Sequence, residues 1–98
     1  LHIASHEGHL EIVKFLIEKG ADINKSNNNG CTPLYIASSK GHLEIVKFLT
    51  DKGADINKSN NNGSIPLYIV SQKGYLEIVK FLIEKSADIN KSNNYGDT

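Results

Sequence analysis

Apolar residues recur along the chain in pairs of short stretches, and each stretch has the spacing of one helix face. Apolar positions within 34–37 are followed, after Gly41, by apolar positions three and four residues apart within 43–49. Residues at this spacing lie on one side of an α-helix. The pattern therefore predicts two short helices that are joined at Gly41.

Residues at the ends of these stretches indicate where the helices begin and end. Thr32-Pro33 is typical of a helix start, because threonine accepts a backbone hydrogen bond and proline suits the first helical position. Gly53 suits the left-handed conformation that follows a helix. The next residues predict an extended arm, and Asn62-Gly63 predicts a tight turn that returns the chain toward the following helix.

The same pattern recurs with a period of 33 residues over the whole chain. Residues 1–33 and 34–66 agree at 26 of 33 positions, and residues 34–65 and 67–98 agree at 23 of 32. We expect helix pairs at about 1–19, 34–52 and 67–85. Such short helices cannot bury their apolar faces alone. Stacking of neighbouring pairs solves this and predicts a solenoid in which each repeat contacts only its neighbours.

Three segments of each period resemble a known repeat family. In the middle copy, segments 30–37 (GCTPLYIA), 41–46 (GHLEIV) and 53–57 (GADIN) are similar to the ankyrin-repeat pattern G-x-T-P-L-H-x-A, G-H-x-x-I-V and G-A-D-x-N. This resemblance implies an all-α solenoid of stacked helix-turn-helix pairs with projecting β-hairpin loops. It also implies a concave, protein-binding face, lined by the hairpin tips and the first helix of each pair.

On this resemblance the chain is a single array. Repeat 1 covers 1–29 and is truncated at its N-terminus, repeat 2 covers 30–62, repeat 3 covers 63–95, and 96–98 begin a fourth. Neither end carries the polar capping repeat that such arrays usually need. We therefore expect the natural protein to continue in both directions.

Three of the departures from the repeated pattern have predicted consequences for packing and stability. Ile65 replaces the capping threonine, which predicts a loss of about 1 kcal/mol at that helix start and a higher melting temperature for Ile65→Thr. Ser86 replaces glycine at a position of expected positive φ, at a cost of roughly 1 kcal/mol. Val70 replaces Ala37 at a tight helix contact and is expected to push its neighbours apart.

Charge and composition exclude several classes of protein. Eleven lysines balance eleven acidic residues and there is no arginine, which argues against nucleic-acid binding. The single cysteine excludes an internal disulfide. The apolar runs are far shorter than a membrane span requires. With no signal peptide in the sequence, we expect a cytoplasmic, monomeric protein without membrane insertion.

The candidate chemistry of the chain is sparse. His2, His6 and His9 lie near Glu7, but Glu7 and His9 lack the spacing of the zinc-protease motif. A tetrahedral site needs three or four ligands with supporting contacts, so we expect no metal. Cys31 has no histidine partner in sequence and is expected to be an inert thiol in a hairpin tip. We expect neither an enzyme nor a cofactor. The ankyrin resemblance implies that His9 and His42 lie where the two helices of a repeat are joined and have a structural role there.

Asparagines at equivalent positions in the three arms leave two interpretations open. Asn24, Asn57 and Asn90 resemble asparagines that dioxygenases hydroxylate in ankyrin arrays. Alternatively, they hold the arms through side-chain-to-backbone hydrogen bonds, which is common for asparagine in turns and is the interpretation we favour.

Candidate partner-binding residues are those that differ between repeats on the first helices and at the hairpin tips. They are His6, Glu7, Asn29, Cys31, Ser39, Lys40, Asn62, Ser64, Gln72, Lys73, Tyr95 and Asp97. This set is polar, with Tyr95 as its one aromatic anchor. We expect a protein–protein interaction module that binds another protein. The alternative is a structural spacer attached to a catalytic or membrane domain elsewhere.

Overall fold

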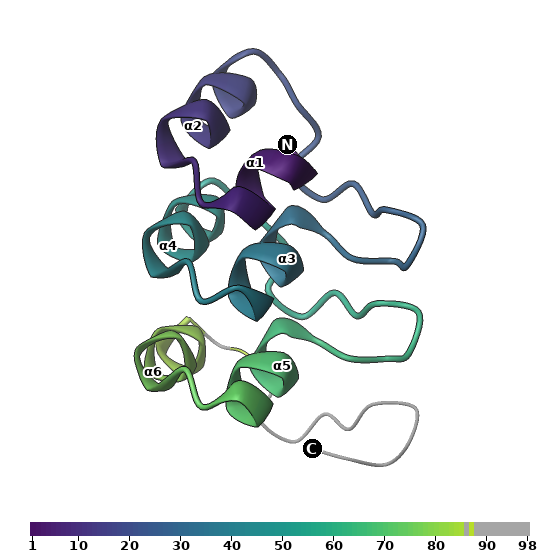
Figure 1. The fold of residues 1–98 in the computed structure, drawn as a ribbon, viewed down its shortest axis with the longest axis vertical. Helices are drawn as coiled ribbons and strands as arrows, with labels where there is room; N and C mark the ends of the chain where they lie inside the picture. The colour runs from purple at the N-terminus through teal and green to yellow at the C-terminus, as the bar shows by residue number, and fades with distance from the viewer. Residues whose placement is uncertain (86, 88–98) are drawn as a thin grey trace.

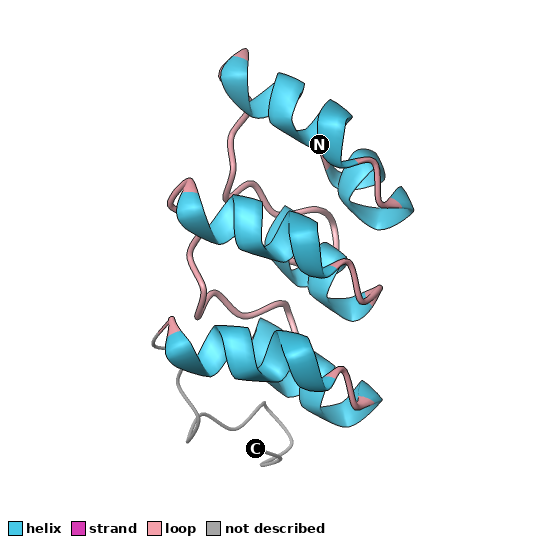
Figure 2. Ribbon diagram, turned by 90° about the vertical axis from the view of Figure 1, so that its left-hand side faces the viewer, coloured by secondary structure: helices cyan, strands magenta, loops and turns pink. Residues whose placement is uncertain are grey.

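The computed structural model describes residues 1–85 and 87. This part of the chain contains six helices and no strand. The helices are α1 (His2–Glu7), α2 (Leu10–Glu18), α3 (Pro33–Ser39), α4 (Leu43–Asp51), α5 (Pro66–Lys73) and α6 (Leu76–Glu84). They form three antiparallel pairs stacked in layers (Figure 2). The predicted all-α solenoid and its three helix pairs are confirmed.

The first helix of each pair lies in the middle of the molecule. Helices α1, α3 and α5 are flanked on one side by the second helices, α2, α4 and α6, and on the other by two projecting arms (Figure 1). The arms are the loops at residues 21–32 and 54–65. Each arm is closed by a backbone hydrogen bond: Asn27 N donates to Cys31 O, and Asn60 N donates to Ser64 O, both at 2.9 Å.

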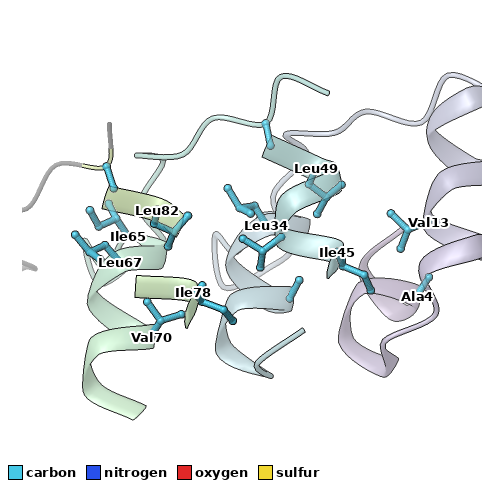
Figure 3. Packing of buried hydrophobic residues seen from close by; sticks show 14 residues of the cluster. Ala4, Val13, Leu34, Ile45, Leu49, Ile65, Leu67, Val70, Ile78 and Leu82 are labelled. Carbon is cyan, nitrogen blue, oxygen red and sulfur yellow. The ribbon is translucent and has the colours of Figure 1, made fainter. Parts of the chain in front are cut away.

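The core runs without interruption through the three layers (Figure 3). Val13, Ile45 and Ile78 come from successive second helices and are at most 2% exposed. Leu34 and Leu67 come from the first helices and pack into the same cluster. Each layer thus covers the apolar side of the next, as the short helices require.

The two later first helices begin differently. Thr32 Oγ1 accepts a hydrogen bond from Tyr35 N at 3.1 Å, whereas Ile65, at the equivalent position, makes no side-chain cap. Ile65 is 1% exposed and belongs to the core. The missing cap is confirmed, but burial of Ile65 changes its expected cost. Val70 is fully buried, as Ala37 is, so the larger side chain is enclosed in the core. Ser86 lies outside the described residues.

Side chains at the helix connections join successive repeats. Gly8 and Gly41 have φ of 80° and 76°, and a ring of the next repeat lies against each of them. His42 covers Gly8, and its Nε2 donates to the carbonyl oxygen of His6 at 2.9 Å. The predicted structural role of this histidine is confirmed for His42. Tyr75 takes the same place over Gly41.

Asparagines join the arms of successive repeats. Asn24 Oδ1 accepts from Asp55 N at 2.8 Å, and Lys58 Nζ donates to Asn24 O at 3.0 Å. Near the tips, Asn61 N donates to Asn29 O at 3.0 Å. Asn24 therefore has the structural role that we favoured, because its side-chain oxygen binds the next arm. Asn90 lies outside the described residues.

Candidate functional site

The first helices and the arms form one side of the molecule, which we call the concave surface (Figure 1). Six predicted residues lie at the C-terminal ends of the first helices, in two rows that follow the repeat. They are His6 and Glu7 in α1, Ser39 in α3 with Lys40 at its C-terminal cap, and Gln72 and Lys73 in α5. All are exposed except Ser39, which is half-buried. The helical repeat thus brings these six residues together on one surface.

Contacts along these rows link neighbouring repeats. His6 Nδ1 donates to Glu7 Oε2 at 2.7 Å, and this hydrogen bond is the main reason that the pKa of Glu7 is lowered. The charges of His6 and, more weakly, Lys40 lower that pKa further. Lys73 Nζ donates to the carbonyl oxygen of Ser39 at 3.0 Å. The surface therefore carries a carboxylate in its first repeat and ammonium groups in the next two.

Two asparagine side chains, those of Asn27 and Asn60, order the backbone of the arm tips. Asn27 Oδ1 accepts from the backbone N–H groups of Asn29 and Cys31, at 2.9 and 3.0 Å. Asn60 Oδ1 accepts in the same way from Asn62 and Ser64, at 2.9 and 3.0 Å. Asn29 and Asn62 are exposed, as a contact with a partner requires.

Ser64 is a correction to the predicted set. Its side chain is 4% exposed, because Tyr35 reaches across from α3 and its hydroxyl hydrogen-bonds Ser64 Oγ at 2.9 Å. Ser64 therefore supports the base of the arm and offers no side chain to a partner. Tyr95 and Asp97, also in the predicted set, lie outside the described residues.

Cys31, at the equivalent place in the first arm, is half-buried and free. Burial raises the pKa of its thiol above the ordinary 9.0, although a hydrogen bond with Asn60 opposes the shift. Because the thiolate is the nucleophilic form, Cys31 is a weak nucleophile at neutral pH.

Two isoleucines on the concave surface are absent from the predicted partner-binding set. Ile3 is 80% exposed, and together with Ile36 it lines a cavity of about 280 Å³ between α1, α3 and the first arm. His2, His6, Glu7 and Asn27 complete the lining. The concave surface is therefore not uniformly polar. All three repeats have isoleucine at this position, as residues 3, 36 and 69, and this was the signal available in the sequence. The predicted set was chosen from residues that differ between repeats, so a residue that all three share was not included.

The histidines near the N-terminus have protein partners. His2 Nε2 donates to Lys25 O at 2.7 Å, and His6 is bonded to Glu7. Within residues 1–85 and 87, no three His, Cys, Asp or Glu side chains are grouped to hold a metal ion. In the same residues, no helix has both the length and the apolar character needed to cross a membrane.

The opposite surface, formed by the second helices, pairs its own charges. Each second helix has one ion pair between a glutamate and the lysine three residues later: Glu11–Lys14 at 3.6 Å, Glu44–Lys47 at 4.0 Å and Glu77–Lys80 at 3.8 Å. Exposed pairs of this kind contribute little to stability. Each of their lysines nevertheless has a carboxylate within 4.0 Å, whereas Lys40 and Lys73 of the concave surface have none among the described residues.

Comparison with known proteins agrees with this architecture. Residues 1–93 match the family model for ankyrin repeats (3 copies). A stretch of 34 residues is 56% identical to part of the probable E3 ubiquitin-protein ligase XBOS33 of Oryza sativa subsp. japonica. That stretch is 35% of this chain and only 6% of the rice protein.

Proposed function

Because the chain belongs to the ankyrin-repeat family, whose members are generally protein–protein interaction modules, we propose that it binds a partner protein through its concave surface and arm tips. The observation that carries this proposal is the position of Ile3. Its large apolar side chain is 80% exposed beside a cavity, whose lining also includes His6 and Glu7 of the two rows. Ile3 and Ile36 together form an apolar patch with polar neighbours around it. An apolar patch with a polar rim is typical of an interaction site.

Binding, not catalysis, is the activity that these residues support. The one thiol has a raised pKa, and the one carboxylate of the first helices is hydrogen-bonded to His6. Cys31 is a free thiol in a chain with a single cysteine, which suits a reducing compartment. This supports a cytoplasmic location.

A structural spacer is the second candidate function. It is favoured by the near-identity of the repeats and by the contacts between adjacent layers, which suit an array that spans a distance. In that case the concave surface would have no partner of its own.

Affinity capture from a lysate of the source cells separates the two functions. The bait is the 98-residue chain, compared with a variant that has alanine at four concave positions, namely Ser39, Lys40, Gln72 and Lys73. A matched control has alanine at Lys14, Lys47 and Lys80 on the opposite surface. Circular dichroism first establishes that all three are equally helical.

Binding at the concave surface predicts a protein that is retained by the wild type and the control but lost by the concave variant. Equal capture by all three baits, or none by any, would contradict the proposal and favour the spacer.

A further inference from the structure

We propose that the cavity between α1 and α3 receives one large apolar side chain from an acidic peptide segment of the partner. This proposal rests on the proposed function and specifies the chemistry of the partner. It combines two observations on the concave surface: an apolar cavity in the first repeat and an excess of positive charge beside it.

The apolar part of the site is formed by Ile3 and Ile36. Both side chains line the cavity, and neither belongs to the core cluster. Exposure of Ile3 is 80%, so most of its apolar area remains in water. Burying this area under a partner side chain is favourable in proportion to the area removed from water. The cavity volume of about 280 Å³ is enough for a single large side chain and too small for a packed helix face.

The charged part of the site is formed by Lys40 and Lys73. Within the described residues, neither lysine has an acidic side chain in ion-pair range, whereas Lys14, Lys47 and Lys80 on the opposite surface each do. Both are exposed, and Lys73 donates to a neutral carbonyl group.

Glu7 offsets only part of this positive charge, because one carboxylate stands against two ammonium groups. It is the only carboxylate of the first helices, and its Oε2 already accepts from His6. Glu7 also lines the cavity, and Lys40 is near enough to lower its pKa. The ammonium group of Lys40 thus lies beside the apolar cavity, where it complements a carboxylate that neighbours the inserted side chain. Electrostatic complementarity of this kind selects among partners.

A phage-displayed library of random octapeptides, selected on the 98-residue chain, tests the proposal without an assumed partner. We expect the enriched peptides to share a large apolar residue with an Asp or Glu within two positions. Synthetic copies are then measured by fluorescence polarisation. Ile3→Ser is expected to weaken their binding about tenfold, as the loss of one buried aliphatic side chain implies. Lys40→Glu is expected to weaken it severalfold, and added salt to weaken wild-type binding.

Two control variants match these changes outside the cavity. Ile12→Ser alters an isoleucine of the same repeat that is 50% exposed on α2, and Lys19→Glu reverses an exposed charge at the end of that helix. Both are expected to bind the peptides as the wild type does. Circular dichroism confirms that the four variants fold.

Enriched peptides without acidic residues, or equal binding by the Ile3→Ser variant, would overturn this proposal. If such peptides still require Ser39 and Gln72, the concave surface is a binding site and only its assigned chemistry is wrong. Failure to enrich any peptide also overturns the proposal, and the lysate capture then decides the proposed function separately.

Discussion

Helices α3 and α5 occupy equivalent places in adjacent repeats but are stabilised at their first residues by different forces. Thr32 caps α3 by a hydrogen bond, while Ile65 leaves α5 uncapped and is itself buried to 1% exposure. A lost cap costs about 1 kcal/mol, and a fully buried isoleucine contributes roughly 1.5–3 kcal/mol. The same position can therefore begin a helix through hydrogen bonding or through apolar contact.

The helix ends differ as well. Gly41 after α3 has φ of 76° and faces Tyr75 of the next repeat, whereas no atom of the described residues lies within 4 Å of a Cβ built on Gly74 after α5. An interior repeat is thus constrained on both sides. Five predictions test this comparison, in order of decreasing effect.

Truncation of Ile65 is expected to have the largest effect. Ile65→Ala removes a buried side chain at the start of α5 and should lower the free energy of unfolding by roughly 3 kcal/mol. Urea unfolding followed by circular dichroism measures this. The control is Ile3→Ala, at an 80% exposed position, which should change the free energy by less than about 0.5 kcal/mol. Similar losses in both variants would show that burial of Ile65 does not stabilise α5.

Alanine substitutions at Gly41 and Gly74, which follow α3 and α5, should separate the cost of backbone strain from the cost of side-chain crowding. Gly74→Ala imposes positive φ on a side chain and should cost about 1 kcal/mol. Gly41→Ala imposes the same φ and also places its Cβ 3.2 Å from the Tyr75 ring, so we expect roughly 2 kcal/mol. Urea unfolding measures the free energy lost in each variant. Equal losses would mean that the Tyr75 ring moves aside without cost.

Removal of the Thr32 cap tests how much hydrogen bonding stabilises the start of α3. Thr32→Ala removes the hydrogen bond to Tyr35 N and is expected to lower the free energy of unfolding by about 1 kcal/mol. Thr32→Ser keeps a hydroxyl and serves as the control. If Ser and Ala are equally destabilising, the lost methyl group and not the cap is responsible.

Burial of Tyr35 predicts a pH effect in the interior repeat, which its hydrogen bond with Ser64 opposes in part. Burial raises the pKa of Tyr35 above its ordinary value of 10.0. A raised folded-state pKa contributes stability that is present below the unfolded-state pKa and is lost as the pH rises through the folded-state value.

Tyr35→Phe should therefore lose about 1 kcal/mol at neutral pH, through the missing hydrogen bond. Between pH 9 and 11, the free energy of unfolding of this variant should decrease less than that of the wild type. Urea unfolding at several pH values measures the difference, and parallel declines would contradict the assignment to Tyr35.

Restoring threonine at the start of α5 is expected to have the smallest effect. Ile65→Thr gains a cap of about 1 kcal/mol but loses apolar contact of roughly the same size. We now expect a change below about 1 kcal/mol, in place of the clear stabilisation expected from sequence alone. A rise in melting temperature of 8 °C or more would show that the cap dominates.

The sequence predicted those features that depend on residues close together in the chain. Helix spacing, the Thr32 cap and the stop near Gly53 are local, and all are present. Burial of Ser64 was missed because Tyr35, which covers it, lies 29 residues away. The cavity at Ile3 was missed for the same reason, since it exists only where α1, α3 and an arm meet.

The contacts between repeats also bear on how such a gene changes length. The hydrogen bonds that cross from one layer to the next join residues 29 to 36 positions apart, close to the 33-residue period. Duplicating or deleting any 33 consecutive codons, wherever the breakpoints fall, therefore leaves every remaining layer with a neighbour of the same kind. A slip by one codon would instead misalign an arm with the one beside it. Unequal recombination between copies is therefore limited in the number of codons exchanged, but it can begin at almost any codon.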